Sequence, residues 1–406
     1  MFQVLTAYIT HIRCVTVVML LTACSLCALS QEPSPAVAVT DSISPAAAPA
    51  DSVKKKNIID HIKAYFDDSN KPKKDPKAFD VGVIGGPYYS NEIKLALGIV
   101  ATGSYSLGEP DSLIPRSFVA VKGKISTSGF VEVGLEGTNI FPHDRFRINY
   151  LMDYYYRPTD YWGIGYERAI NDDFKSKFND IYFAARIDGL VRIGRHIFVG
   201  PGLMFSRVKA TNITDEAVWA DQPQRVTSFG AAISGMFDTR DNLTAPTRGV
   251  TVEFEQHFYP RFMGNTSHSF SATAVTARAY QKVWRGGILA ERVHGRFAYG
   301  NVPWNMLSTL GGSSNMRGYY EGQYRDKCEM DVTLELRQHV WRRNSIVVWG
   351  GVGGIAPDLG SFRLSQALPN VGVGYRWEFK KNSNVRIDIG VGRHCKGFVF
   401  GINEAF

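Results

Sequence analysis

Long runs in which apolar and polar residues alternate constrain the fold of this chain more than any other feature. Successive side chains of a β-strand point to opposite sides, so such a run predicts a strand with one apolar and one polar face. Residues 145–156 show the pattern, and residues 249–259, 331–340 and 385–391 repeat it. In the first run the apolar face carries Phe146, Ile148, Tyr150, Met152, Tyr154 and Tyr156, and the polar face carries Arg145, Arg147, Asn149 and Asp153.

Two kinds of β-protein have such strands, the soluble β-sandwich and the transmembrane barrel. The polar faces here carry charges of both signs along ten or more residues, whereas strands of globular proteins average about five or six. The apolar faces are rich in Tyr, Phe and Trp toward the strand ends, as in the aromatic girdles of membrane barrels. The mean hydropathy of −0.14 is too polar for a bundle of membrane helices. We therefore predict an all-β fold, a transmembrane antiparallel barrel over residues 79–406.

The number of strands follows from the turn signals between the alternating runs. About seventeen segments qualify as strands, but single-chain bacterial barrels have an even number, so we predict sixteen. Tight turns are predicted at Ser126–Gly129, Pro158–Tyr161, Ile193–His196 and Lys380–Asn384.

Residues 1–30 resemble a secretory signal peptide, with an apolar core at Val15–Leu21. Two cleavage sites compete. The sequence Ala28-Leu29-Ser30 before Gln31 resembles a signal peptidase I site, whereas Leu21-Thr22-Ala23-Cys24 resembles a lipobox that would lipidate Cys24. No later run of 18 apolar residues predicts a membrane helix. An exported chain with a barrel pattern is expected in the bacterial outer membrane.

Residues 31–78 are predicted to be a periplasmic linker, disordered apart from a short helix near Ile58–Phe66. Much of the net charge of +8 comes from lysines in this segment. We interpret these lysines as solvated or as touching the membrane surface, so the expected partners are outer-membrane lipids. A nucleic-acid partner does not fit an exported chain.

Residue patterns for chemistry are weak. Cys328 and Cys395 are the only cysteines beyond the signal, and the sequence leaves open whether they pair. The nine histidines are scattered, so neither a metal site nor a cofactor is predicted. Asp153, Glu255 and His257 could be imagined at a barrel-rim catalytic site, but charged lumen residues usually line the pore. We therefore expect no enzymatic activity.

Three local patterns go beyond a generic barrel. A turn before the alternating run 249–259 contains Asp238, Arg240, Asp241, Pro246 and Gly249. A glycine-rich segment between strands contains Gly311, Gly312, Met316, Arg317, Gly318 and Tyr319. The final run, Gly397–Phe406, is predicted to close the barrel and contains Phe398, Phe400, Ile402 and Phe406.

In this order and spacing the three patterns resemble the surface-antigen barrels of the BamA and TamA superfamily, over about residues 79–406. The run YYEGQYRDK after the glycine-rich segment further resembles a subgroup of small barrels of this family from the Bacteroidetes. Family members also carry periplasmic POTRA domains. The roughly fifty residues between the predicted signal and barrel cannot hold one, so a small member without POTRA domains is expected.

The resemblance implies that the segment with Arg317 folds into the lumen between strands 11 and 12. There it would pair with a Glu on the next strand, matched by Glu335, and with an Asp one strand later. That second position holds Gly351, so Asp331 or Asp388 would have to substitute. A guanidinium in the lumen can form bidentate, charge-assisted hydrogen bonds with a wall carboxylate. The alternative is an exposed loop arginine.

Two functions follow. The resemblance implies insertion or translocation of proteins at the outer membrane, with nascent outer-membrane proteins as partners. In that mechanism an incoming strand pairs at the seam between the first strand, near Phe79–Gly86, and the last. The alternative is a passive pore or structural barrel whose loop narrows the lumen.

Overall fold

The computed structural model describes residues 79–108, 116–219, 222–243, 245–265, 267–380 and 383–406. The predicted signal peptide, both of its cleavage sites and the linker with its short helix lie outside the described residues.

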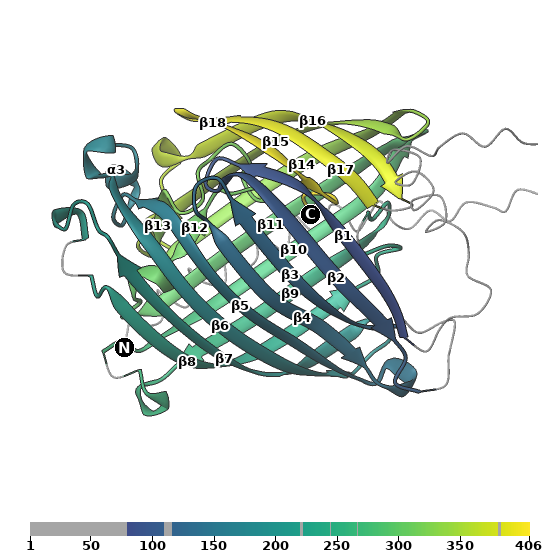
Figure 1. Ribbon diagram of the computed structural model, residues 1–406, viewed down its shortest axis with the longest axis horizontal. Helices are drawn as coiled ribbons and strands as arrows, with labels where there is room; N and C mark the ends of the chain where they lie inside the picture. Colours follow the sequence, from purple (N-terminus) through teal and green to yellow (C-terminus); the bar gives the residue numbers. More distant parts are fainter. Residues whose placement is uncertain (1–78, 109–115, 220–221, 244, 266, 381–382) are drawn as a thin grey trace, which may run out of the picture. The chain divides into compact units, whose positions relative to one another are not determined.

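The described residues form a closed barrel of sixteen antiparallel strands, so the predicted fold class and strand number are confirmed. The barrel strands are β1 (Phe79–Ser90), β2 (Lys94–Tyr105), β3 (Ser117–Ser126), β4 (Val131–Ile140), β5 (Phe146–Tyr161), β6 (Ser176–Arg192), β7 (Ile197–Thr211), β8 (Arg225–Asp238), β9 (Gly249–Tyr259), β10 (Phe270–Trp284), β11 (Gly287–Gly300), β14 (Cys328–Trp341), β15 (Asn344–Ala356), β16 (Leu368–Lys380), β17 (Ser383–Gly392) and β18 (Cys395–Ile402). Each strand pairs with its neighbour in the chain, and β1 meets β18 (Figure 1).

Shorter elements, including several 3-10 helices of three residues, lie in the connections between barrel strands. A two-stranded sheet of β12 (Ser308–Leu310) and β13 (Tyr324–Asp326) flanks the glycine-rich segment, and α3 (Tyr166–Ala169) follows β5. Among the described residues, no helix has the length and apolar character needed to span a bilayer.

Alternation gives the barrel an apolar outside and a charged lumen. Val81, Leu97 and Val371 are each more than 60% exposed on the outer face. Charged residues of the opposite set, such as Arg292 and Asp331, are buried in the lumen. Exposed apolar side chains all around a barrel favour lipid as the surrounding solvent.

One predicted turn is wrong. Pro158–Tyr161 belongs to β5, where Pro158 lies opposite Asn179 of β6. The neighbour on the other side, β4, pairs with β5 only as far as Tyr156. Proline lacks an N–H, and it is tolerated in a strand where no partner needs that donor. The predicted turns at Ser126–Gly129 and Ile193–His196 coincide with connections between strands. Lys380–Asn384 spans the change from β16 to β17, and its residues 381–382 lie outside the described residues.

The predicted closing strand is shorter than expected, because β18 ends at Ile402. Asn403 has a left-handed backbone with φ of 67°. Its N–H donates to the Asn384 carbonyl of β17 over 2.7 Å. Ala405 is buried. Residues 403–406, called the tail below, therefore leave the strand direction and turn into the lumen.

The two ends of the barrel differ. The three longest connections, residues 162–175, 212–224 and 301–327, follow the fifth, seventh and eleventh barrel strands and so leave the same end, called the loop end. This end contains an aromatic cluster in which the ring of Trp219 lies 4.6 Å from Tyr161 and 5.0 Å from Trp304. The opposite end, where β1 begins and β18 ends, is called the turn end.

Candidate functional site

Arg317 lies inside the barrel, on the connection between β11 and β14, the eleventh and twelfth barrel strands. Its side chain is 1% exposed. One guanidinium nitrogen donates to Glu335 of β14, and the other donates to Asp388 of β17 over 2.8 Å. The guanidinium also stacks 3.7 Å from the ring centroid of Trp349. Two carboxylates and an aromatic face thus hold the cation, as planar guanidinium chemistry favours.

The second carboxylate does not come from the strand on which the family pattern places it. Gly351 is on β15, and a Cβ at this position would lie 2.6 Å from Asn370 Oδ1 and 2.8 Å from the Val332 carbonyl. The position is therefore crowded even for alanine. Asp388 supplies the carboxylate from β17, while Asp331 instead pairs with Arg292.

Close backbone packing seats the glycine-rich segment on the barrel wall. Gly318 has a φ of 115°, a left-handed backbone that favours glycine. A Cβ on Gly318 would lie 3.0 Å from the backbone of Gly390, and one on Gly397 would lie 3.0 Å from the Gly318 Cα. Gly390 and Gly397 are themselves paired across β17 and β18. Three glycines thus meet where the segment touches the last two strands.

Polar contacts fix the neighbours of Arg317. The Tyr319 hydroxyl donates to the Pro369 carbonyl and accepts from the Arg393 N–H, both over 2.7 Å. Asn370 Nδ2 donates to the Arg317 carbonyl over 3.0 Å. Met316 is buried.

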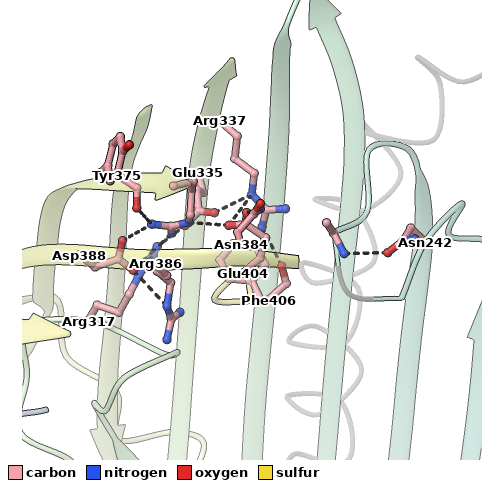
Figure 2. A network of polar contacts seen from close by, with 12 residues as sticks. Asn242, Arg317, Glu335, Arg337, Tyr375, Asn384, Arg386, Asp388, Glu404 and Phe406 are labelled. Carbon is pink, nitrogen blue, oxygen red and sulfur yellow. Dashed lines mark hydrogen bonds and ion pairs between the residues drawn. The ribbon is translucent and has the colours of Figure 1, made fainter. Parts of the chain in front are cut away.

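The ion pairs continue from Arg317 to the tail (Figure 2). Glu335 also accepts from Arg337 Nε over 2.8 Å. Arg337 Nη2 donates to the Phe406 carbonyl over 2.7 Å. Glu404 accepts from Arg376 Nε over 2.8 Å. We call the seven charged side chains of this region the lumen network: Arg317, Glu335, Arg337, Arg376, Arg386, Asp388 and Glu404.

The turn motif lies at the turn end, between β8 and β9. Arg240 pairs with Asp238 over 2.7 Å. Gly249 has a φ of 106°, and a Cβ there would meet the Thr239 carbonyl at 2.4 Å. Pro246 is buried within the turn. Asp241 accepts from the Thr247 hydroxyl over 2.5 Å and from the backbone N–H groups of Thr247 and Arg248.

Asp241→Ala removes these three acceptor contacts and is expected to lower the free energy of unfolding by about 1–2 kcal/mol. Partial burial works to raise the pKa of Asp241, but the hydrogen bonds from Thr247 and Arg248 outweigh it and lower the pKa. A carboxyl with a lowered pKa stabilises the folded state above its unfolded pKa of about 4, and this contribution is lost as the pH falls further. Urea unfolding in vesicles at pH 7 and pH 3 measures both effects. An equal cost at the two pH values would contradict the assignment.

The remaining candidate residues are part of structural ion pairs. His257 Nε2 lies 3.0 Å from Glu255, which also accepts from Arg186 over 2.6 Å. Asp153 lies 2.9 Å from Lys122. Cys328 and Cys395 are free thiols. In the described part of the chain, no group of three or more His, Cys, Asp or Glu residues could hold a metal ion.

Comparison with known proteins identifies the family of the barrel. Residues 129–351, more than half of the chain, match the Omp85 superfamily domain. The chain belongs to the Omp85 superfamily. Among curated proteins, none has a sequence that matches this Omp85 barrel.

Solved structures that resemble this Omp85 barrel share its fold at low identity. BamA from Haemophilus ducreyi lacking POTRA domains 1–3 is 12% identical with a TM-score of 0.54, over 81% of this chain and 71% of that one. CdiB from Escherichia coli is 13% identical with a TM-score of 0.55, over 79% and 62%. CdiB from Acinetobacter baumannii is 10% identical with a TM-score of 0.52, over 81% and 60%. The chain spans less than two thirds of both CdiB structures.

Some residues of the site escaped the sequence analysis. Trp349 and Gly390 both contact Arg317. Trp349 begins the segment that aligns with the family's second carboxylate motif, but no role was predicted for it, and Gly390 belongs to none of the predicted motifs. The sequence did contain a signal for Gly390. Residues 385–391 alternate β-branched residues on the outer face with charged residues on the inner face, and Gly390 takes the place of the third inner residue. Such a glycine in a strand often marks a close backbone approach.

Proposed function

We propose that this Omp85 barrel inserts or translocates proteins at the outer membrane by pairing strands of nascent outer-membrane proteins at the seam between β1 and β18. Lipid of the outer membrane surrounds its apolar face. No catalytic step, cofactor or metal enters the mechanism. The observation that carries the proposal is the short pairing of β18 with β1.

The seam is the strand pair of the barrel with the fewest residues in register. One residue pair, Tyr89 with Phe400, is in β-register across it. By contrast, β1 pairs with β2 along its whole length, from Phe79 to Ser90. Because β18 ends at Ile402, it runs beside only the last few residues of β1. A strand end with little pairing is an available template for another strand.

Side chains hold the seam near the loop end. Asn91, in the turn after β1, donates through Nδ2 to the Lys396 carbonyl over 2.7 Å. Its Oδ1 accepts from the Phe398 N–H over 3.4 Å. The rings of Tyr89 and Phe398 lie 5.4 Å apart. These few contacts can break without disturbing the fifteen other strand pairs, which favours opening at this place.

The direction of entry follows from the two ends. Membrane barrels have short turns on the periplasmic side and long loops outside the cell. The loop end therefore faces the exterior, and the turn end faces the periplasm. In this orientation β18 stops short of β1 on the periplasmic side, from which a nascent protein arrives.

Locking the seam tests the proposal. Tyr89→Cys with Phe400→Cys, in a background with Cys328→Ser and Cys395→Ser, places two thiols at directly paired positions, where a disulfide can form. We expect cells that depend on this variant to lose client barrels from the outer membrane, and reductant to restore them. Quantitative proteomics of the outer membrane measures the loss.

The matched control places the same pair inside the wall, with Val133→Cys and Tyr154→Cys, paired between β4 and β5. This disulfide should leave the outer-membrane proteome unchanged. Normal client levels with the seam fully oxidised would refute the proposal.

The lumen contents disfavour the alternative of a passive pore. The aromatic cluster of Tyr161, Trp219 and Trp304 lies at the loop end. The segment with Arg317 lies inside the barrel and reaches from β14 to β17. A barrel with these obstacles is better suited to opening at its wall than to conduction along its axis.

A further inference from the structure

The lumen network contains more guanidinium groups than side-chain carboxylates. Four guanidinium groups share three side-chain carboxylates, and all seven side chains are at most 7% exposed. Asp388 receives three of the four. Its two oxygens lie 2.8 Å from Arg317 and 2.5 Å from Arg376, whereas Arg386 Nε is 3.7 Å away. Arg386 is therefore left outside hydrogen-bond distance.

Arg386 is buried without its usual acceptors. It is 4% exposed, and its Nε and Nη1 atoms have no hydrogen-bond partner among the described residues. Burying a charge without an adequate counter-charge is costly, and the cost is relieved by an anion. A guanidinium binds carboxylates best, because its N–H groups match two carboxylate oxygens.

Arg386 lies beside the seam. It is opposite Gly401 of β18 in the strand register. A Cβ on Gly401 would lie 4.0 Å from Arg386 Nη2 and 3.4 Å from the Tyr88 ring of β1. The glycine thus lets the guanidinium reach across β18 toward β1. Two residues before Tyr88, a Cβ on Gly86 would have nothing within 4 Å, so the lumen side of β1 is open there.

We propose that Arg386 is a carboxylate-binding site that receives an inward-facing Asp or Glu of a client strand paired at the seam. A client residue beside Gly86 would be a diagonal neighbour of Arg386, about 7–8 Å away, which is within reach of long side chains. This inference rests on the proposed strand pairing at the seam and adds the chemistry that the site selects. Clients with an acidic residue at that inward position are bound most tightly.

Two matched peptides test the proposal on the full-length protein in nanodiscs. Both are labelled ten-residue strands of alternating Val and Thr, and one central Thr is replaced by Glu or by Gln. Fluorescence anisotropy measures their affinities. We expect the wild-type protein to bind the Glu peptide about tenfold or more tightly than the Gln peptide, as a charge-assisted hydrogen bond provides. Arg386→Gln should bring the two affinities together.

Controls separate the possible failures. Arg363→Gln, in an exposed loop, should keep the wild-type preference. Equal binding of both peptides to the wild type would overturn the carboxylate site while leaving strand pairing intact. Binding of neither peptide would instead overturn the strand pairing on which the inference rests. The wild-type comparison decides even if Arg386→Gln does not fold.

Free acetate distinguishes a client site from a general anion site. It carries the same carboxylate without a strand, so we expect it to compete with the Glu peptide only at concentrations far above that of the peptide. Competition at concentrations similar to the peptide would show that the strand contributes nothing to recognition, and the proposal would fall.

Discussion

Glu335→Ala is expected to be among the most damaging single changes in the barrel wall. Glu335 accepts from both Arg317 and Arg337, so its loss leaves two buried guanidinium groups with fewer partners. Breaking a buried ion pair by removing one member costs about 3–5 kcal/mol, because the other charge stays buried. Since water reaches parts of a barrel lumen, we expect the lower end of this range in urea unfolding.

A double-mutant cycle shows whether Arg317 and Glu335 act as a unit. Arg317→Ala should loosen the glycine-rich segment as Glu335→Ala does, and the double variant should cost little more than either single one. The loosened segment should make the single-channel conductance in planar bilayers larger or noisier. It should also expose Tyr319–Arg325 to proteases. Fully additive costs would mean that the pairing contributes nothing.

Glu253→Ala is the matched control for this cycle. Glu253 also pairs with an arginine, Arg278, over 2.8 Å, but its side chain is 37% exposed to the lumen. An exposed ion pair contributes at most about 1 kcal/mol, so this variant should remain near the wild type. If the seam operates as proposed, the Glu335 variant should also lower client levels, and the Glu253 variant should not.

Gly390→Ala is expected to displace the glycine-rich segment without removing any charge. The added Cβ would lie 2.4 Å from the Arg317 carbonyl oxygen and 2.8 Å from its carbon. Both are backbone atoms, so no side-chain rotation relieves the clash. Overpacking of this kind costs about 1–3 kcal/mol. The segment should therefore detach from the wall, with faster proteolysis at Tyr319–Arg325.

The control for this change is Gly86→Ala, on the lumen side of β1, where the added Cβ meets nothing within 4 Å. It should fold and resist protease as the wild type does. Protection of the segment in Gly390→Ala equal to the wild type would show that the contact among Gly318, Gly390 and Gly397 does not hold it.

The barrel was predictable because lipid outside and charge inside impose a period of two on nearly every strand. The predicted strand at residues 249–259, for example, has the same first and last residues as β9. The error at Pro158 has a physical cause. A proline predicts a turn because it cannot donate a hydrogen bond to a neighbouring strand. Here the pairing of β4 with β5 stops before Pro158, so no such hydrogen bond is lost. Where a neighbouring strand ends is set by tertiary pairing, which local sequence does not encode.

The site was predictable only in part. Arg317 lies on the connection that leads into β14, the strand of Glu335, and family resemblance places the two residues together. Asp388 is 71 positions after Arg317. It can contact Arg317 only because closure of the barrel places β14 and β17 on either side of that guanidinium. Several carboxylates face the lumen, so the sequence alone left Asp331 and Asp388 as alternatives. The inward turn of the tail was missed because the strand was predicted to run to the terminal aromatic residue Phe406, whereas Asn403, a residue type that tolerates the left-handed region, ends it earlier.

The tail also has a consequence for the order of assembly. Glu404 lies 28 positions after Arg376 and can meet it only once β16, β17 and β18 have formed their hairpins. Its contact with Arg337 further requires β14 in place, 3.7 Å from the carboxylate. Contacts between distant segments form after local ones, since loop closure costs entropy first. The tail therefore settles only after β14 and β16–β18 have paired, and its contacts stabilise the native state chiefly by slowing unfolding.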